Sequence, residues 1–328
     1  IGDGTSDYSG GSDSDDYFGQ SVSLNYSGNR VAVSAPFADG LNNATNVCGQ
    51  IYIYEYSDST LSNTTDTWIL SNNNVLIAGS SGGTRLGEYQ RSVNLNRSSD
   101  ETIDGKYLVV SATDVDTAMV WENNSGSWQQ KGQTLSLDGF SCAINENGTI
   151  IAVSKSAQNG FVYLYYYNES STEWVLEHTI EKGSGYGTSH NWGICIDINN
   201  IGNIFILGAN YGNYAQLYKY SNTDITQSGS WSNTTISPSN SDSENFAGSV
   251  FMSGDGSHVV MGDAYGYDDN RGYIEVYETG EPHYATNTTY VAAIPPELVS
   301  DSVSIVSNNY DTTKAKATDE VTLSFEYD

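Results

Sequence analysis

The chain has 328 residues and carries 12 Lys and Arg against 40 Asp and Glu, which gives a formal net charge of −28. Such a chain is a poor partner for nucleic acids and anionic membranes, because both require basic surface. No apolar run reaches about 20 residues, so we predict no membrane-spanning segment. The absence of a leader and of an initial Met suggests a piece of a longer protein.

The sequence repeats about every 54 residues, and each copy opens with a glycine beside an aromatic or apolar residue. A short apolar strand follows each opening. These first strands are predicted near residues 20–24, 92–95, 141–144, 194–198 and 248–252. A unit of this size cannot bury its own apolar faces, so the repeat predicts a stacked or circular array.

Three further strands follow in each copy. The second is a near-continuous apolar run such as 30–36 or 204–209, which is typical of a strand buried on both faces. The third alternates aromatic and aliphatic residues, as in 49–55 and 160–165. A Trp then begins a fourth strand, of which 128–135 is an example. The fold class is therefore all-β, a β-propeller of about five four-stranded blades.

The opening Phe18-Gly19-Gln20-Ser21-Val22-Ser23-Leu24, the run Val31-Ala32-Val33-Ser34-Ala35-Pro36 and the strand Gly49-Gln50-Ile51-Tyr52-Ile53-Tyr54 carry a family resemblance. They resemble the FG-GAP repeats known from the heads of integrin α-subunits, over about residues 1–290. We assign residues 1–295 to the propeller and residues 296–328 to a linker and a partial β-domain. Residues 303–309 and 315–325 resemble the first two strands of a bacterial-type Ig-like sandwich.

The resemblance implies calcium in the loops between first and second strands, but these loops have lost most of their carboxylates. We expect no cofactor, with calcium a weak alternative; Asp13, Asp15, Asp263 and Asp268 are the weak candidate ligands. None of the four histidines has the spacing of a zinc or triad site.

Nine Asn-x-Ser/Thr acceptors predict covalent N-glycans, with those after the third strands favoured. The acceptors are Asn25, Asn43, Asn63, Asn96, Asn123, Asn147, Asn168, Asn233 and Asn287. Of the three cysteines, Cys142 and Cys195 lie near the same place in adjacent repeats. A disulfide between them is one interpretation, and two buried free thiols are the favoured one; Cys48 has no context of a nucleophile.

These observations favour a non-catalytic, extracellular glycoprotein that is a structural or adhesive part of a large surface or appendage protein, such as a filament. Its expected partners are further copies of itself or other surface glycoproteins. One alternative is a propeller that recognises a protein or glycan ligand, and a second is a polysaccharide-acting enzyme. The few arginines (Arg30, Arg85, Arg91, Arg97 and Arg271) argue against an anionic-sugar site, and carboxylate pairs are a tertiary property that the sequence does not show.

Overall fold

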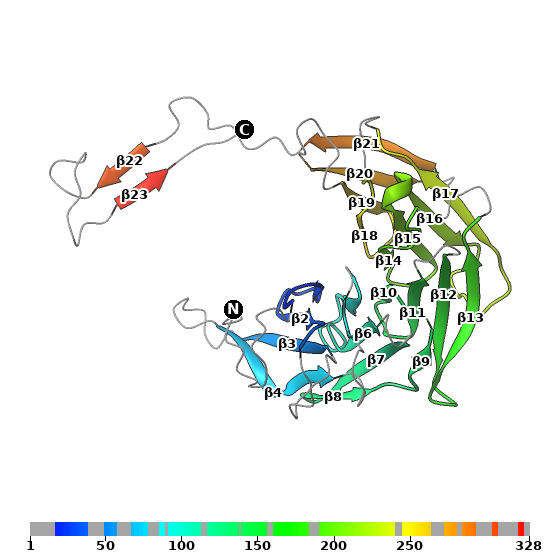
Figure 1. Ribbon diagram of the computed structural model, residues 1–328, viewed down its shortest axis with the longest axis horizontal. Coiled ribbons are helices and arrows are strands. Elements are labelled where there is room, and N and C mark those ends of the chain that lie inside the picture. Colours follow the sequence, from blue (N-terminus) through cyan, green and yellow to red (C-terminus); the bar gives the residue numbers. More distant parts are fainter. Residues whose placement is uncertain are drawn as a thin grey trace. The chain divides into compact units, whose positions relative to one another are not determined.

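A computed structural model describes residues 17–38, 49–57, 67–77, 85–88, 91–112, 117–137, 139–155, 160–183, 190–239, 245–263, 272–280, 284–292, 304–307 and 321–324. The chain divides into two compact units, Ile1–Tyr290 and Val291–Asp328. The first unit holds five antiparallel sheets, called blades 1 to 5 below, which follow one another in chain order (Figure 1).

Each blade is built on a four-strand meander in which sequential strands are hydrogen-bonded neighbours. Blade 1 contains β1 (Val22–Leu24), β2 (Arg30–Ala35), β3 (Gln50–Ser57) and β4 (Thr67–Ile77). Blade 2 contains β5 (Val93–Leu95), β6 (Tyr107–Ala112), β7 (Thr117–Asn124) and β8 (Ser127–Gln130), with the short β9 (Leu135–Ser136) also paired to β7. Blade 3 contains β10 (Ser141–Ile144), β11 (Ile150–Lys155), β12 (Phe161–Asn168) and β13 (Glu173–Glu181).

Blade 4 contains β14 (Ile196–Ile198), β15 (Ile204–Ala209), β16 (Tyr214–Tyr220) and β17 (Trp231–Ile236), with a 3-10 turn at Asn210–Gly212. Blade 5 contains β18 (Ser249–Met252), β19 (His258–Asp263), β20 (Tyr273–Gly280) and β21 (Tyr284–Ala292). The predicted all-β propeller of five four-stranded blades is confirmed, and the first strands lie where the repeat places them. Neighbouring first strands contact one another in the order β1, β5, β10, β14 and β18, so they form the inner edges of the blades.

One predicted strand is broken. The sequence suggests a continuous fourth strand over 128–135, whereas the chain leaves β8 after Gln130 and rejoins β7 only at β9. Gly132 has a left-handed backbone, with φ of 74°. A regular strand does not tolerate that conformation, so the chain turns out of the ladder there.

The core of each blade follows from the two strand patterns. The second strands of blades 2, 3 and 4 are buried on both faces, and every residue of β6 is buried, whereas β19 of blade 5 alternates. In the third strands the aliphatic residues enter the core: Val162 and Leu164 of β12 are fully buried, while the intervening Tyr163 and Tyr165 are only partly buried. Period-2 alternation therefore divides β12 between core and an amphipathic outer side, whereas β16 of blade 4 is buried on both faces.

A serine and a glycine at recurring positions join blade 1 to blade 2 and blade 3 to blade 4. The hydroxyl of Ser34 donates to the carbonyl of Gly87 at 2.8 Å, and Ser154 donates to Gly193 at 2.6 Å. Both glycines open the next repeat with positive φ, and a Cβ at Gly193 would lie 3.0 Å from the Cβ of Ser154. The repeated serine and the opening glycine are thus the two halves of one contact between blades.

The second unit contains two described strands, β22 (Ser304–Ser307) and β23 (Val321–Ser324), which form an antiparallel pair. A strand pair is not a sandwich, so the Ig-like resemblance stays a prediction. No helix in the described ranges is long and apolar enough to cross a membrane.

Candidate functional site

Inner-strand residues hold the blades together through polar side chains that accept backbone N–H groups of the next blade. Ser23 accepts from Leu95 at 2.9 Å, and Ser141 accepts from Ile196 at 3.1 Å. These hydroxyls meet backbone donors that would otherwise be buried without a partner. The inner strands therefore carry polar residues for a structural reason.

Asp197, at the centre of β14, also accepts a backbone N–H of the next blade, but through a carboxylate instead of a hydroxyl. Its Oδ2 accepts the backbone N–H of Met252 in blade 5 at 2.8 Å. Its side chain is only 1% exposed. A buried carboxylate requires compensation by opposite charge and further hydrogen bonds, and two arginines of blade 2 supply both.

Arg91 and Arg97 lie on either side of β5 and converge on Asp197. Arg91 Nη2 is 2.8 Å from Asp197 Oδ1, and Arg97 Nη2 is 3.0 and 3.1 Å from the two carboxylate oxygens. Arg91 also donates to the carbonyls of Ile196 at 3.1 Å and Val250 at 2.7 Å. Arg91 thus joins blade 2 to blades 4 and 5.

The backbone of Arg91 is unusual as well, because its φ of 59° is in the left-handed region. Its carbonyl accepts from the N–H of Cys142 at 2.9 Å and from the hydroxyl of Ser141 at 3.2 Å. A non-glycine residue in this region costs free energy and persists only where the surroundings fix it. Here blade 3 fixes the backbone of Arg91 while its side chain extends to Asp197.

Arg97 is the less constrained of the two arginines. Its guanidinium bonds only through Nη2, and among the described residues Nε and Nη1 donate to no acceptor. Its Cζ lies 4.3 Å from the ring centroid of Phe251, which is 45% exposed. The ring covers one face of the guanidinium in a cation–π contact, and this contact does not use the N–H groups of Nε and Nη1.

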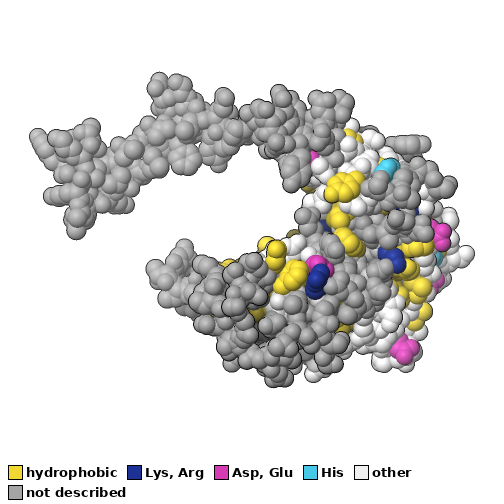
Figure 2. All heavy atoms as spheres, in the orientation of Figure 1, with side chains coloured by type: hydrophobic (Ala, Val, Ile, Leu, Met, Phe, Trp, Pro, Cys, Tyr) yellow, Lys and Arg dark blue, Asp and Glu magenta, His cyan; other side chains and the backbone are white. Residues whose placement is uncertain are grey.

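Arg91, Arg97 and Phe251 line a cleft of about 380 Å³, here called the inner-strand cleft. The cleft is also lined by Ser23, Asn94 and the exposed Tyr26. Two guanidinium groups share one carboxylate, so the cluster has a formal net charge of +1 in a chain of −28. Figure 2 shows exposed hydrophobic side chains beside Lys or Arg and Asp or Glu side chains on the described part of one face. The cleft can hold a small polar molecule with an apolar side and an electron-rich oxygen.

Of the four candidate metal ligands of the sequence, the described part of the chain contains only Asp263. Asp263 is buried at the end of β19 and accepts the N–H of Asn245 at 3.4 Å. Asp13, Asp15 and Asp268 lie outside the described residues. The described residues contain no group of three or more His, Cys, Asp or Glu side chains that could hold a metal ion.

The two described cysteines are buried free thiols, as favoured by the sequence. Burial raises the pKa of each thiol to about 12, so neither is a ready nucleophile. Cys48 lies outside the described residues. His178, His190 and His258 do not line the inner-strand cleft.

The acceptor asparagines divide by exposure. Asn147 and Asn233 are exposed and Asn168 is partly exposed. Asn25 and Asn96 are buried, because each Oδ1 accepts the first N–H of the following strand at 2.8 Å. Their Nδ2 atoms donate internally, that of Asn96 to two carbonyls at 2.7 Å.

Glycan attachment at Nδ2 of Asn25 or Asn96 conflicts with this packing, and Asn123 is buried as well. Asn145 and Asn199 make the same contact in blades 3 and 4, so this asparagine closes the first hairpin in four of the five blades. Asn43 and Asn63 lie outside the described residues, and the side chain of Asn287 is not described.

No known protein family matches the sequence. No curated protein matches it either. Among solved structures, the periplasmic gluconolactonase of Pseudomonas aeruginosa matches with a TM-score of 0.52 and 13% identity, covering 86% of this chain and 75% of that one. A Bacteroides uniformis protein proposed to be a 6-phosphogluconolactonase matches with a TM-score of 0.51 and 11% identity, over 94% and 88%. A similar Bacteroides fragilis protein gives 0.51 and 10%, over 86% and 73%. At this identity the likeness establishes the fold.

These neighbours correct one prediction from the sequence. The composition and repeats favour a non-catalytic structural or adhesive module, whereas the propellers that the chain resembles are named as lactonases, which are enzymes. The small number of arginines misleads, because Arg91 and Arg97 meet at Asp197 only in three dimensions. A charged residue in the middle of the apolar Ile196-Asp197-Ile198 strand is the signal that could have found the site.

Proposed function

We propose that the chain is an enzyme that hydrolyses a small sugar-derived lactone in the inner-strand cleft. The observation that carries the proposal is the guanidinium of Arg97, which lines the cleft with unengaged donors beside an exposed aromatic ring. The fold likeness to proteins named as gluconolactonases supports the same class of substrate.

The chemistry requires stabilisation of a developing oxyanion. Water attacks the lactone carbonyl carbon, the ring C–O bond breaks, and the products are a hydroxyl group and a carboxylate with release of one proton. Donors held toward the carbonyl oxygen lower the barrier to the tetrahedral intermediate, and in this cleft Nε and Nη1 of Arg97 are such donors. Phe251 offers an apolar face to the C–H side of a sugar ring.

Asp197 positions the arginines in this scheme. Both of its oxygens accept hydrogen bonds, Oδ1 from Arg97 and Oδ2 from Arg97 and Met252, and Oδ1 also forms an ion pair with Arg91. No lone pair direction remains well placed to take a proton from water. Its role is therefore to fix the guanidinium planes before the substrate arrives.

The test is proton release from D-glucono-1,5-lactone and its 6-phosphate, measured by pH-stat and corrected for spontaneous hydrolysis. We expect the wild-type chain to accelerate at least one of them. Arg97→Met keeps the aliphatic stem and should lower kcat/KM by about 10²–10³-fold, as loss of an oxyanion donor does. Arg85→Met, a matched change at a residue that pairs with Glu88 outside the cleft, should leave kcat/KM unchanged. No acceleration of either lactone, or equal activity of Arg97→Met, refutes the proposal.

Four further features remain proposals beside this activity. FG-GAP ancestry of the repeats and an Ig-like continuation rest on the motifs alone. An extracellular location with N-glycans rests on composition and on the exposed or partly exposed acceptors Asn147, Asn168 and Asn233. Intact mass of the native protein before and after glycosidase treatment tests the glycans, and an unchanged mass refutes them.

A further inference from the structure

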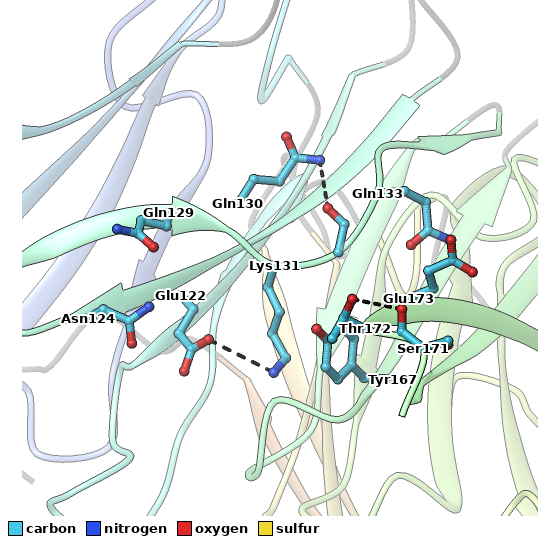
Figure 3. A pocket seen from close by; sticks show the side chains of 11 residues that line it. Glu122, Asn124, Gln129, Gln130, Lys131, Gln133, Tyr167, Ser171, Thr172 and Glu173 are labelled. Atoms are coloured by element: carbon cyan, nitrogen blue, oxygen red, sulfur yellow. Dashed lines mark hydrogen bonds and ion pairs between the residues drawn. The ribbon is translucent and has the colours of Figure 1, made fainter. Parts of the chain in front are cut away.

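A second cleft of about 500 Å³ lies between the outer strands of blades 2 and 3, and is here called the outer cleft. One wall comes from β7 and β8, with Asn124 and Gln129 among its residues, and the other from β12 and the start of β13, with Tyr167 and Glu173. Figure 3 shows these side chains around Lys131. The outer cleft shares no lining residue with the inner-strand cleft.

The floor of the outer cleft is held by contacts between the two blades. Gln133 binds the backbone of Trp174 twice, donating to its carbonyl at 2.7 Å and accepting its N–H at 2.8 Å. The indole of Trp174 donates to the carbonyl of Lys131 at 2.8 Å. A Cβ at Gly132 would lie 2.8 Å from the Trp174 ring. The break between β8 and β9 therefore packs one blade against the other and shapes a preformed cavity.

Lys131 is the residue that points to a ligand. Its side chain is 8% exposed, and its Nζ lies 3.8 Å from the ring centroid of Tyr167. The nearest carboxylate oxygens, of Glu169 and Glu122, are at 3.9 and 4.0 Å. These distances exceed those of hydrogen bonds, so among the described residues the ammonium donates to no acceptor. The lysine side chain is thus nine-tenths buried, and it lines a polar cavity with ammonium N–H groups that a ligand oxygen could accept.

The charges around the outer cleft select the class of ligand. Lys106 pairs with Glu122 at 3.0 Å, and Lys131 lies between Glu122 and Glu169, so these four groups sum to zero. Glu173 adds a negative charge on the far wall, which disfavours an anion. The remaining lining is mainly amide and hydroxyl groups, which both donate and accept.

Asn124 and Gln129 have exposed side chains whose amides have no partner among the described residues. Hydroxyl-rich neutral molecules satisfy such a mixed set of donors and acceptors. We propose that the outer cleft binds a neutral saccharide of one or two sugar units, with Lys131 donating to its hydroxyl or ring oxygens. This site is independent of lactone hydrolysis and would hold a carbohydrate away from the inner-strand cleft.

Titration calorimetry of the full chain with maltose, cellobiose and lactose tests the proposal, with glucuronate as an anionic probe. We expect saturable binding of at least one neutral disaccharide with a Kd in or below the low-millimolar range, about −4 kcal/mol or tighter. Lys131→Met keeps the stem on Tyr167 and should weaken that binding at least about tenfold. Lys219→Met, on β16 of blade 4, is the matched control and should bind as the wild type does.

The double variant Asn124→Ala/Gln129→Ala covers the event that Lys131→Met fails to fold, because both side chains are exposed. It should also weaken binding at least about tenfold while keeping wild-type lactone turnover. Absence of binding by all three disaccharides, binding of glucuronate alone, or unchanged affinity in the double variant overturns the proposal. Failure of lactone hydrolysis bears only on Arg97 and the inner-strand cleft, so the two proposals fail separately.

Discussion

Replacement of Asp197 by asparagine should destabilise the propeller strongly although it changes the side chain volume very little. The carboxylate is 1% exposed, forms an ion pair with Arg91, and accepts hydrogen bonds from Arg97 and from the N–H of Met252. The amide of the variant would retain one acceptor oxygen but present an NH₂ group to donors. Loss of the counter-charge from two partly buried guanidiniums costs about 3–5 kcal/mol by analogy with broken buried pairs.

The arginine side chains are 20% and 21% exposed, so water recovers part of that cost. We therefore expect a decrease of about 2–4 kcal/mol in the free energy of unfolding. Urea unfolding followed by tryptophan fluorescence measures it. Asp224→Asn is the matched control: this aspartate is exposed, bonds mainly within its own turn, and should cost below about 1 kcal/mol. A cost for Asp197→Asn within the error of the control would show that the arginine cluster is not a structural centre.

Three other outcomes follow from single contacts. Gly148 has a φ of 64°, and the Cβ of Gly148→Ala would overlap the ring of Tyr107, so we expect the free energy of unfolding in urea to fall by about 2–4 kcal/mol. Gly126 also has a positive φ but faces open space, so Gly126→Ala should lower the free energy of unfolding by only about 1 kcal/mol. The two buried thiols, whose pKa burial raises to about 12, should not react with a disulfide reagent at pH 8 until the chain is unfolded; rapid modification of the native protein would contradict this. Hydrogen bonds from Ser253 and Ser257 lower the pKa of Asp255 from 3.8 to about 2. The small contribution of Asp255 to stability is therefore present above pH 3.8 and is lost as the pH falls toward 2. Asp255→Asn should flatten that part of the stability–pH curve, and an unchanged curve refutes this reasoning.

The sequence predicts the blades well because each strand type has its own local pattern. The apolar second strands and the alternating third strands recur in register, and strand alternation requires no knowledge of distant contacts. The break after Gln130 has no such local signal, because it depends on how Gly132 packs against Trp174 of the next blade. The buried hairpin asparagines show the same limit: Asn25 and Asn96 match an acceptor motif, and only the three-dimensional contacts reveal that their amides are already engaged.

The candidate site could be predicted from local sequence patterns even less well than the strand break and the buried asparagines. About 100 residues and one whole blade separate Arg91 and Arg97 from Asp197 along the chain, and no periodicity relates them. Their convergence follows from blade order, which brings the inner strands β5, β14 and β18 within reach of one another. Composition points away from the site, since it shows few arginines in a polar, acidic chain.

For the proposed lactone hydrolysis, that acidic composition bears on which substrate would suit the site. A net charge of −28 repels anions at long range, and screening by salt only partly removes this repulsion. A neutral lactone approaches without that penalty, while its hydrolysis product is an anion that the field of the protein helps to expel. Asp197 offsets one of the two guanidinium charges, and the unengaged N–H groups of Arg97 remain donors. The cluster is therefore better suited to an oxyanion that develops during the reaction than to a phosphate carried by the substrate, which favours the neutral gluconolactone over its 6-phosphate.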